Sequence, residues 1–365
     1  MPTKRATPLG NHITSLSTVS HDKMKLATYV LLTLLVVQPV AAGVKKSSPF
    51  EPLQAKLADD QAPAIKGVEG WYFLRQELEH LVAGKFWGES AAQASNTKKS
   101  EYADPIPAIL DFKKDLDEFG IELILVPIPA KAAVYPDKTG LAHTKGDGSE
   151  LHSRHAEFYQ ILEEQGVAVF DPFTDLVAGR ETGTTYCQTD THFSGHGLRL
   201  IAQALADSIQ QMAWYRPEKQ KHFKEELREL TITGDLALMS DEPDASETLP
   251  LHFIYRSGSE ENLPFSPDPA SPVLLLGDSH TLVFSVGGEL HAKSAGLPEN
   301  LAYLLNMPID VIGMRGSGVT PARIKLFQKS RKNPLYIKEK KLIVWVFSVR
   351  EFTGQGGWRK IPLLP

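Results

Sequence analysis

The strongest constraint on the fold is an apolar run that ends abruptly in a glycine. Residues 272–276 are all apolar, and Gly277-Asp278-Ser279 follows at once. Such a run is typical of a strand buried on both faces, as in parallel sheets. Gly277 permits a sharp turn, so Ser279 is expected at the carboxyl end of a central strand, where open α/β sheets build their sites. Ser279 is therefore a candidate nucleophile.

A serine in this position needs a base, because an alcohol is a weak nucleophile at neutral pH. Asp190 and His192 stand two positions apart, just before a helix expected to begin after Ser194. A carboxylate there can fix the tautomer of the imidazole and leave the other ring nitrogen free to face Ser279. We predict that these three side chains form one catalytic unit. The alternative is that Asp190 caps the helix and His192 only packs.

The remainder of the chain alternates between strand and helix patterns. Helical spacing of apolar residues is found at 104–119, 149–165, 298–305 and 321–332, and apolar strand-like runs at 121–126, 167–170, 309–312 and 342–347. This order favours parallel βαβ construction. We therefore expect a three-layer α/β/α domain with a mostly parallel central sheet. Residues 213–270 are irregular and are expected to be an insertion, and a helical region is expected after Ser279.

Two loops at strand ends carry further candidate site residues. The exit from the run at 309–312 is rich in glycine, so the backbone N–H of Gly316 could hold an oxyanion, with Arg315 as a charged donor. The alternative is a plain flexible turn. Lys131 and Tyr135 follow the run at 121–126 and could reach substrate, although a structural role is equally expected.

Several other functional classes find little support in the sequence. His192 and His196 have the i,i+4 spacing of zinc ligands but lack the glutamate of an HExxH motif, and neither GxGxxG nor GxxxxGKS is present. We therefore expect no metal and no cofactor. The single cysteine, Cys187, excludes an internal disulfide and remains an alternative nucleophile. A net charge of −5 gives no reason to expect nucleic-acid binding.

The N-terminal region predicts export. Residues 1–23 are polar and patternless, and are expected to be disordered or untranslated. Residues 24–42 combine a lysine, an apolar stretch and small residues, which is typical of a signal peptide. An uncleaved anchor in the inner membrane is the alternative. Residues 43–64 are expected to be a linker, and residues 65–365 one domain.

Together these motifs resemble the bacterial alginate O-acetyltransferase family of the AlgJ/AlgX type. The resemblance covers most of residues 65–355 and rests on GWYFL at 70–74, PIPAK at 127–131, DTHF at 190–193, GDS at 277–279 and RE at 350–351. It implies an SGNH hydrolase-like domain in circularly permuted order, because Asp-x-His precedes Gly-Asp-Ser. It also implies that Ser279 is the nucleophile, His192 the base and Asp190 the orienting acid.

The resemblance further implies a periplasmic enzyme, soluble or tethered to the inner membrane. Such an enzyme acetylates alginate or a similar exopolysaccharide through an acetyl-serine intermediate. The expected partners are a polysaccharide acceptor and a membrane O-acyltransferase that supplies the acetyl groups. Two alternatives stay open: a carbohydrate acetyl esterase, which would use water as acceptor, and a non-catalytic, polysaccharide-binding assembly component.

Overall fold

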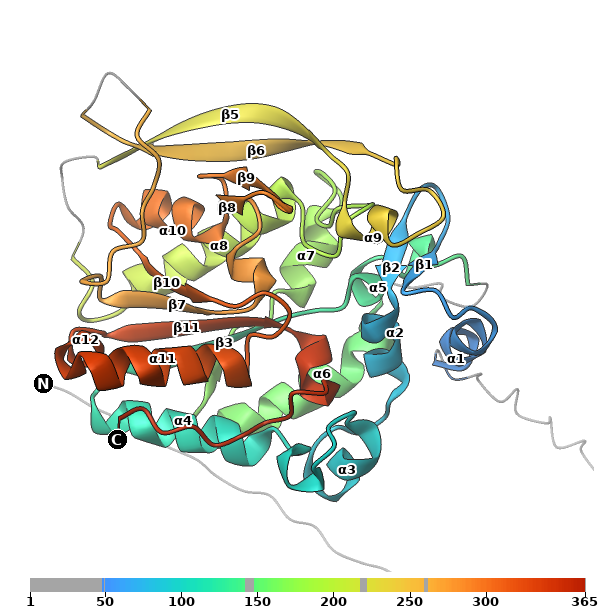
Figure 1. Ribbon diagram of the computed structural model, residues 1–365, viewed down its shortest axis with the longest axis horizontal. Coiled ribbons are helices and arrows are strands. Elements are labelled where there is room, and N and C mark those ends of the chain that lie inside the picture. Colours follow the sequence, from blue (N-terminus) through green and yellow to red (C-terminus); the bar gives the residue numbers. More distant parts are fainter. Residues whose placement is uncertain (1–47, 49, 142–147, 217–221, 259–261, 365) are drawn as a thin grey trace, which may run out of the picture. The chain divides into compact units, whose positions relative to one another are not determined.

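A five-stranded sheet lies at the centre of the fold (Figure 1). The computed structural model describes residues 48, 50–141, 148–216, 222–258 and 262–364. The strand order is β10-β7-β11-β3-β4 and all four pairings are parallel. The strands are β3 Glu122–Ile128, β4 Ala168–Val169, β7 Val273–Gly277, β10 Asp310–Gly313 and β11 Leu342–Ser348. The mostly parallel sheet predicted from the apolar runs is confirmed.

The two central strands explain the apolar run and its glycine. Every residue of β7 and of its neighbour β11 is buried, as expected for strands covered on both faces. Gly277 lies opposite Val346 in the parallel register. A Cβ on Gly277 would lie 1.9 Å from the carbonyl oxygen of Val346, so no larger residue fits without a backbone shift.

Helices cover both faces of the sheet and complete the three layers. In the view of Figure 1, α4, α6, α11 and α12 lie below the sheet, and α7, α8 and α10 lie above it. Their bounds are α4 Ile106–Glu118, α6 Ser149–Glu164, α7 Phe173–Gly179, α8 Gly195–Gln210, α10 Leu297–Leu305, α11 Thr320–Lys332 and α12 Pro334–Lys338. Ser194 is the N-cap of α8, since its Oγ accepts a hydrogen bond from the backbone N–H of Gly197 at 3.1 Å.

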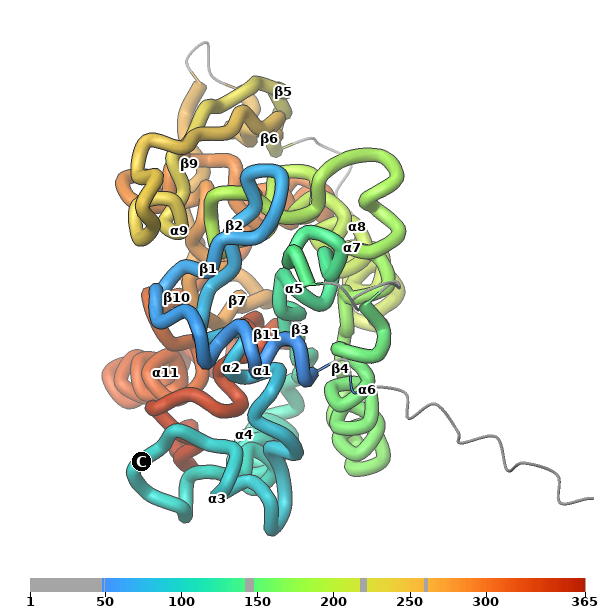
Figure 2. The backbone as a smooth tube through the Cα atoms, turned by 90° about the vertical axis from the view of Figure 1, so that its right-hand side faces the viewer, coloured from blue at the N-terminus to red at the C-terminus, as the bar shows by residue number. Residues whose placement is uncertain are grey.

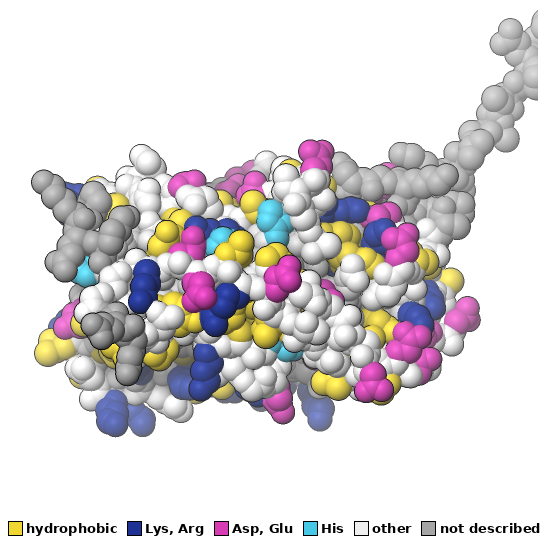
Figure 3. Space-filling model, turned by 90° about the horizontal axis from the view of Figure 1, so that it is seen from above, with side chains coloured by type: hydrophobic (Ala, Val, Ile, Leu, Met, Phe, Trp, Pro, Cys, Tyr) yellow, Lys and Arg dark blue, Asp and Glu magenta, His cyan; other side chains and the backbone are white. Residues whose placement is uncertain are grey.

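The irregular region 213–270 contains an element that the sequence did not reveal. Strands β5 (Phe223–Ile232) and β6 (Glu247–Arg256) form a long antiparallel hairpin above α8 and α10 (Figure 1). Most residues of β5 are exposed, which explains a charged sequence that does not look like a strand. Basic and acidic side chains are interspersed on this face of the molecule (Figure 3).

The prediction of a helical region directly after Ser279 is wrong. A short 3-10 turn, Ser279–Thr281, is followed by a small hairpin of β8 (Val286–Gly287) and β9 (Leu290–Lys293). Gly287 and Gly288 both adopt positive φ angles, 72° and 64°. Two successive residues in this conformation end a helix and favour a tight hairpin turn.

The N-terminal part of the described chain packs beside the sheet. The predicted segments 1–23 and 24–42 lie outside the described residues, as does the start of the predicted linker. The rest of that linker contains helix α1, Phe50–Asp59, which forms because Leu53 and Leu57 are buried in the core. The remaining elements are β1 Ala64–Lys66, β2 Tyr72–Leu74, α2 Arg75–Val82, α3 Ala91–Ala94, α5 Lys131–Val134 and α9 Asp235–Leu238. Among the described helices, none is both long enough and apolar enough to cross a bilayer.

Candidate active site

Ser279 sits where β7 ends, in a turn that is fixed by its neighbour Asp278. One carboxylate oxygen of Asp278 accepts the backbone N–H of His280 at 2.8 Å, and the other accepts the N–H of Ser348 at 2.7 Å. Burial alone would raise the pKa of Asp278, but the His280 imidazole, the charge of Arg350 and the N–H of Ser348 hold it well below its usual range. An ionised, buried Asp278 therefore ties the end of β7 to the end of β11 and orients Ser279.

The structure brings together the three side chains of the predicted catalytic unit. The Nε2 atom of His192 lies 2.7 Å from Ser279 Oγ, and Nδ1 lies 2.6 Å from Asp190 Oδ1. Asp190 is only 1 % exposed and His192 4 %, whereas Ser279 is 8 % exposed. The candidate nucleophile is thus the most accessible of the three. This is the geometry in which a hydroxyl, an imidazole and a carboxylate can share a proton relay.

The charges at the site favour an ionised Asp190 beside a basic imidazole. Burial would lower the pKa of His192, but the negative charge of Asp190 and the hydrogen bond to it raise this pKa above its ordinary value. Burial would likewise raise the pKa of Asp190, yet His192 and His291 hold it well below the usual range. Asp190 can therefore orient His192 and stabilise its protonated form.

The second oxygen of Asp190 has partners that sequence reasoning missed. His291 Nε2 lies 2.8 Å from Asp190 Oδ2, and the backbone N–H of Asp235 donates to the same oxygen at 3.0 Å. His291 belongs to the β8–β9 hairpin and has a φ of 69°. Asp235 in turn accepts the backbone N–H of Thr191 at 2.7 Å, so both sides of the Asp190–His192 segment are held. No local spacing signals these contacts, because they join distant parts of the chain.

Lys131 has a structural role rather than a place on an open substrate surface. Its side chain is completely buried. Its Nζ donates to the carbonyl oxygens of Tyr72 and Asp190, both at 2.7 Å, and to that of Cys187 at 2.9 Å. Lys131 thus ties β2 to the Asp190 loop, and β2 lies next to α9 (Figure 2). The predicted contact of Lys131 with substrate is not supported.

Tyr135 is likewise buried, with 3 % of its surface exposed. Its hydroxyl accepts the backbone N–H of Thr185 at 2.7 Å, and its ring stacks on Trp71 with centroids 4.1 Å apart. Both contacts are internal. The structure therefore favours the structural alternative for Tyr135 as well.

The glycine-rich exit of β10 packs against the turn that carries Ser279. Gly318 lies so close that a Cβ there would be 2.3 Å from the backbone nitrogen of Asp278. Gly316 is exposed, with a φ of 86° and open space beside it. Arg315 is half-exposed, and its guanidinium pairs with Glu289 at 2.5 Å. The structure gives Arg315 a surface partner, while the role of Gly316 in holding an oxyanion stays a prediction.

Other reactive groups near the site are already engaged. Ligand atoms of Asp190, His192 and Asp235 lie within 4.8 Å of one another, a spacing that a metal could use. All three side chains hydrogen-bond within the network described above, which accounts for their proximity. Cys187 is fully buried, and this burial raises the pKa of its thiol well above the ordinary value, so it is a poor nucleophile.

Comparisons with a family model and with named relatives indicate the same protein family. A family model described as "SGNH hydrolase-like domain, acetyltransferase AlgX" matches residues 64–349. Four relatives carry the name "Probable alginate O-acetylase AlgJ". That of Pseudomonas syringae pv. tomato is 25% identical over 247 residues, which cover 66% of this chain and 57% of the relative. That of Pseudomonas aeruginosa is 24% identical over 295 residues, which cover 78% and 69%. The chain thus spans little more than half of the first relative.

Solved structures show the same fold at low sequence identity. The O-acetyltransferase domain of Pseudomonas putida AlgJ superposes with a TM-score of 0.59 at 18% identity, over 80% of this chain and 92% of that one. Pseudomonas aeruginosa AlgX gives a TM-score of 0.55 at 18% identity, over 78% and 62%. Because the family model covers most of the chain, this protein belongs to the AlgX family of SGNH hydrolase-like acetyltransferase domains.

Proposed function

We propose that this protein is a polysaccharide O-acetyltransferase that works through an acetyl-serine intermediate. The observation that carries the proposal is the 2.7 Å contact between His192 Nε2 and Ser279 Oγ, with Asp190 on the other side of the imidazole. Family membership supports acetyl as the transferred group. The names of the AlgJ relatives support alginate, or a similar exopolysaccharide, as the acceptor.

In the first half-reaction, Ser279 takes the acetyl group from a donor. His192 Nε2 accepts the hydroxyl proton as Oγ attacks the acetyl carbonyl carbon. Asp190 stabilises the imidazolium, and backbone N–H groups near Ser279 and Gly316 hold the oxyanion. The bond to the leaving group then breaks, and the leaving group takes the proton from His192. The product is acetyl-Ser279 with neutral His192.

In the second half-reaction, a sugar hydroxyl accepts the acetyl group. His192 removes the hydroxyl proton as the sugar oxygen attacks the acetyl-serine carbonyl. The bond to Ser279 Oγ breaks, and His192 returns the proton to the serine. We place this reaction in the periplasm, with a membrane O-acyltransferase as the source of acetyl groups and an N-terminal signal or inner-membrane anchor. The sequence of residues 24–42 supports this location.

The test is acetyl transfer to an oligosaccharide by the Ser279→Ala protein. Loss of a triad residue should lower the rate by several orders of magnitude, while the thermal unfolding midpoint stays close to that of the wild type. A folded Ser279→Ala protein with an unchanged rate would refute the proposal.

A carbohydrate acetyl esterase is the second candidate, because the same acyl-enzyme can react with water. Ser279 keeps 8 % of its surface exposed, which is enough for a water molecule to reach its hydroxyl. Competition decides between the two: a transferase should form mainly acetylated oligosaccharide at millimolar acceptor, and an esterase mainly acetate. A purely binding role would fit side chains held far apart, and the 2.7 Å contact between His192 Nε2 and Ser279 Oγ argues against it.

A further inference from the structure

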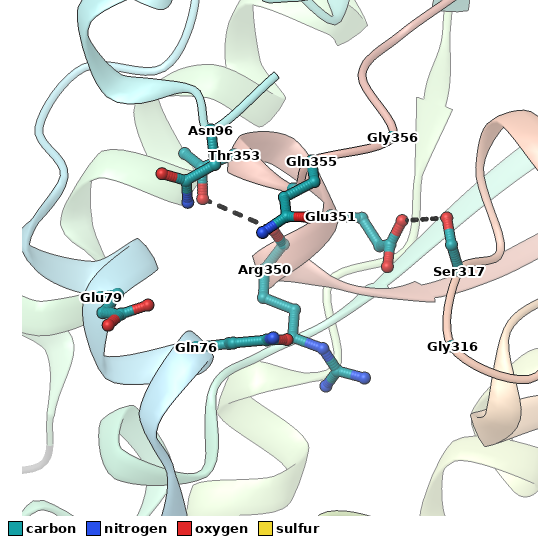
Figure 4. Close-up of a pocket in the computed structure, with 11 residues that line it drawn as sticks. Gln76, Glu79, Asn96, Gly316, Ser317, Arg350, Glu351, Thr353, Gln355 and Gly356 are labelled. Atoms are coloured by element: carbon teal, nitrogen blue, oxygen red, sulfur yellow. Dashed lines mark hydrogen bonds between the residues drawn. The ribbon is translucent and has the colours of Figure 1, made fainter. Parts of the chain in front are cut away.

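Two loops meet at the turn of Ser279, and each is held by a glutamate. One loop is the exit of β10, where Ser317 Oγ donates to the carboxyl group of Glu351 at 2.6 Å (Figure 4). The other is formed by residues 187–192, and we call it the His192 loop. Glu351 accepts a side-chain hydroxyl, whereas Glu247, the first residue of β6, binds the backbone of the His192 loop itself.

The carboxylate of Glu247 binds two successive backbone N–H groups of the His192 loop. Its Oε2 accepts the N–H of Gln188 at 2.9 Å, and its Oε1 accepts the N–H of Thr189 at 2.8 Å. Oε1 also accepts the hydroxyl of Thr189 at 2.7 Å. Thr189 is only 3 % exposed, so water is a poor substitute for these acceptors. The carboxylate therefore fixes the orientation of two adjacent peptide groups.

The connection between β5 and β6 packs directly on the His192 loop. A Cβ on Gly234 would lie 2.2 Å from the carbonyl carbon of Thr189, so backbone meets backbone at this point. Asp235 follows and accepts the N–H of Thr191 at 2.7 Å. Both ends of the connection thus bind the loop through a carboxylate, with Asp235 near its start and Glu247 at its end.

An ammonium group binds the opposite poles of the same peptide groups. The Nζ atom of Lys131 donates at 2.9, 3.4 and 2.7 Å to the carbonyl oxygens of Cys187, Gln188 and Asp190. Burial lowers the pKa of Lys131, and the negative charge of Glu247 opposes this shift, so the two side chains attract each other. With carbonyls bound to the cation and N–H groups bound to the anion, one orientation of the loop backbone is favoured.

The orientation of this backbone determines where the imidazole of His192 lies. Asp190 and His192 belong to the loop, and the N–H of His192 donates to Asp190 Oδ1 at 3.0 Å. The Nε2 atom of His192 lies 2.7 Å from Ser279 Oγ. Proton transfer requires this short separation, and a misplacement of about 1 Å can lower a rate about 100-fold. A rotation of the peptide groups at 188–189 would move the imidazole, because only a few residues separate them.

We propose that Glu247 is a positioning residue for acetyl transfer. Its carboxylate holds the backbone of the His192 loop and thereby keeps His192 Nε2 within reach of Ser279 Oγ. Glu247 takes no part in proton transfer and acts only through the loop. The inference rests on the proposed function, because it requires that His192 activates Ser279.

The test compares Glu247→Gln with the wild-type protein in single-turnover acetylation by p-nitrophenyl acetate. A side-chain amide has one acceptor oxygen and one donor group, so in either orientation a donor faces one of the two N–H groups. The rate at saturating ester should fall by about tenfold to 100-fold, while the half-saturating ester concentration changes by less than about twofold. The final amount of acetyl-Ser279 per protein, measured by mass spectrometry, should stay at the wild-type level.

Two further variants control for charge and for stability, and the unfolding midpoint of each protein is measured alongside. Glu229→Gln removes a carboxylate from an exposed position of β5 in the same hairpin and should retain the wild-type rate. Glu247→Asp keeps two acceptor oxygens and introduces no donor, although its side chain is one methylene shorter. Its rate should therefore lie between those of Glu247→Gln and the wild type, and it replaces Glu247→Gln in the test if that variant does not fold.

Four results would overturn the positioning role. These are a wild-type rate in folded Glu247→Gln, an equal loss in Glu229→Gln, a rate of Glu247→Asp no higher than that of Glu247→Gln, and a lower acetyl yield at an unchanged rate constant, which would indicate fewer folded molecules. Failure of both Glu247 variants to fold would also refute it, because the residue would then be needed for stability. Failure of the proposed function looks different, since Ser279 of the wild-type protein would then carry no acetyl group.

Discussion

Replacement of His291 tests whether the second oxygen of Asp190 matters for the reaction. His291→Leu removes the 2.8 Å hydrogen bond to Asp190 Oδ2 and leaves only the N–H of Asp235 on that oxygen. A hydrogen bond to a charged group contributes about 1.5–3 kcal/mol. If the transition state loses this stabilisation, the rate of acetyl-serine formation falls roughly 10- to 150-fold. Because Asp235 retains its contact, we expect a value near the lower end.

The pH dependence of the rate distinguishes a role of His291 in positioning Asp190 from a general loss of structure in the variant. His192 must be neutral to accept a proton, so the rate falls as the pH drops through its pKa. Without His291, the negative charge of Asp190 is less compensated and raises the pKa of His192 further. The acid limb of the pH–rate profile should therefore move to higher pH in His291→Leu. His291→Gln retains a donor of similar reach and should restore both the rate and the profile.

The assay is single-turnover acetylation by a small acetyl ester, followed by mass spectrometry from acidic to alkaline pH. The unfolding midpoint of each variant is measured alongside. A His291→Leu protein that stays folded, with a wild-type rate and an unshifted acid limb, would refute a positioning role. Equal losses in the Leu and Gln variants would show that the ring is needed for packing instead.

Three further predictions follow from the same contacts. The acid limb of the wild-type rate should lie above the ordinary pKa of histidine, because Asp190 raises that of His192; a limb below it would contradict the charge arrangement. Gly277→Ala should destabilise the protein by several kcal/mol or prevent folding, since the new Cβ would meet the Val346 carbonyl; denaturant unfolding with an unchanged midpoint would argue against the close approach. Lys131→Met should lower the unfolding free energy by more than about 2 kcal/mol, because four carbonyls lose their donor. A loss of acceptor affinity at unchanged stability would instead indicate that Lys131 contacts the substrate.

The sequence was most informative where local pattern and burial coincide. The apolar run before Gly277 identified a doubly covered strand, and so placed Ser279 at the edge where parallel strands end. The capped helix after Ser194 placed His192 just before a helix start. These two local predictions, together with the order of strands and helices, were enough to anticipate the contact between His192 and Ser279.

Long-range partners were not accessible in the same way. His291 lies 101 positions from Asp190 and Asp235 lies 45 positions away, and neither stands in a recognisable motif. A hairpin whose first strand is mostly exposed lacks the apolar signal of a buried strand, so the sequence pattern does not predict β5. Lys131 resembled a surface cation because the carbonyls that satisfy it come from other segments. In each case the decisive partner is supplied by tertiary structure.

The most direct test of the central claim is to locate the acetyl group after a single turnover. The protein is mixed with an acetyl donor ester, quenched in acid, digested and mapped by mass spectrometry. The account predicts one acetyl group on the peptide that contains Ser279, absent in Ser279→Ala and in His192→Ala, and lost when an oligosaccharide acceptor is added before the quench. Acetylation of another residue, or transfer to the oligosaccharide without a labelled Ser279, would contradict it.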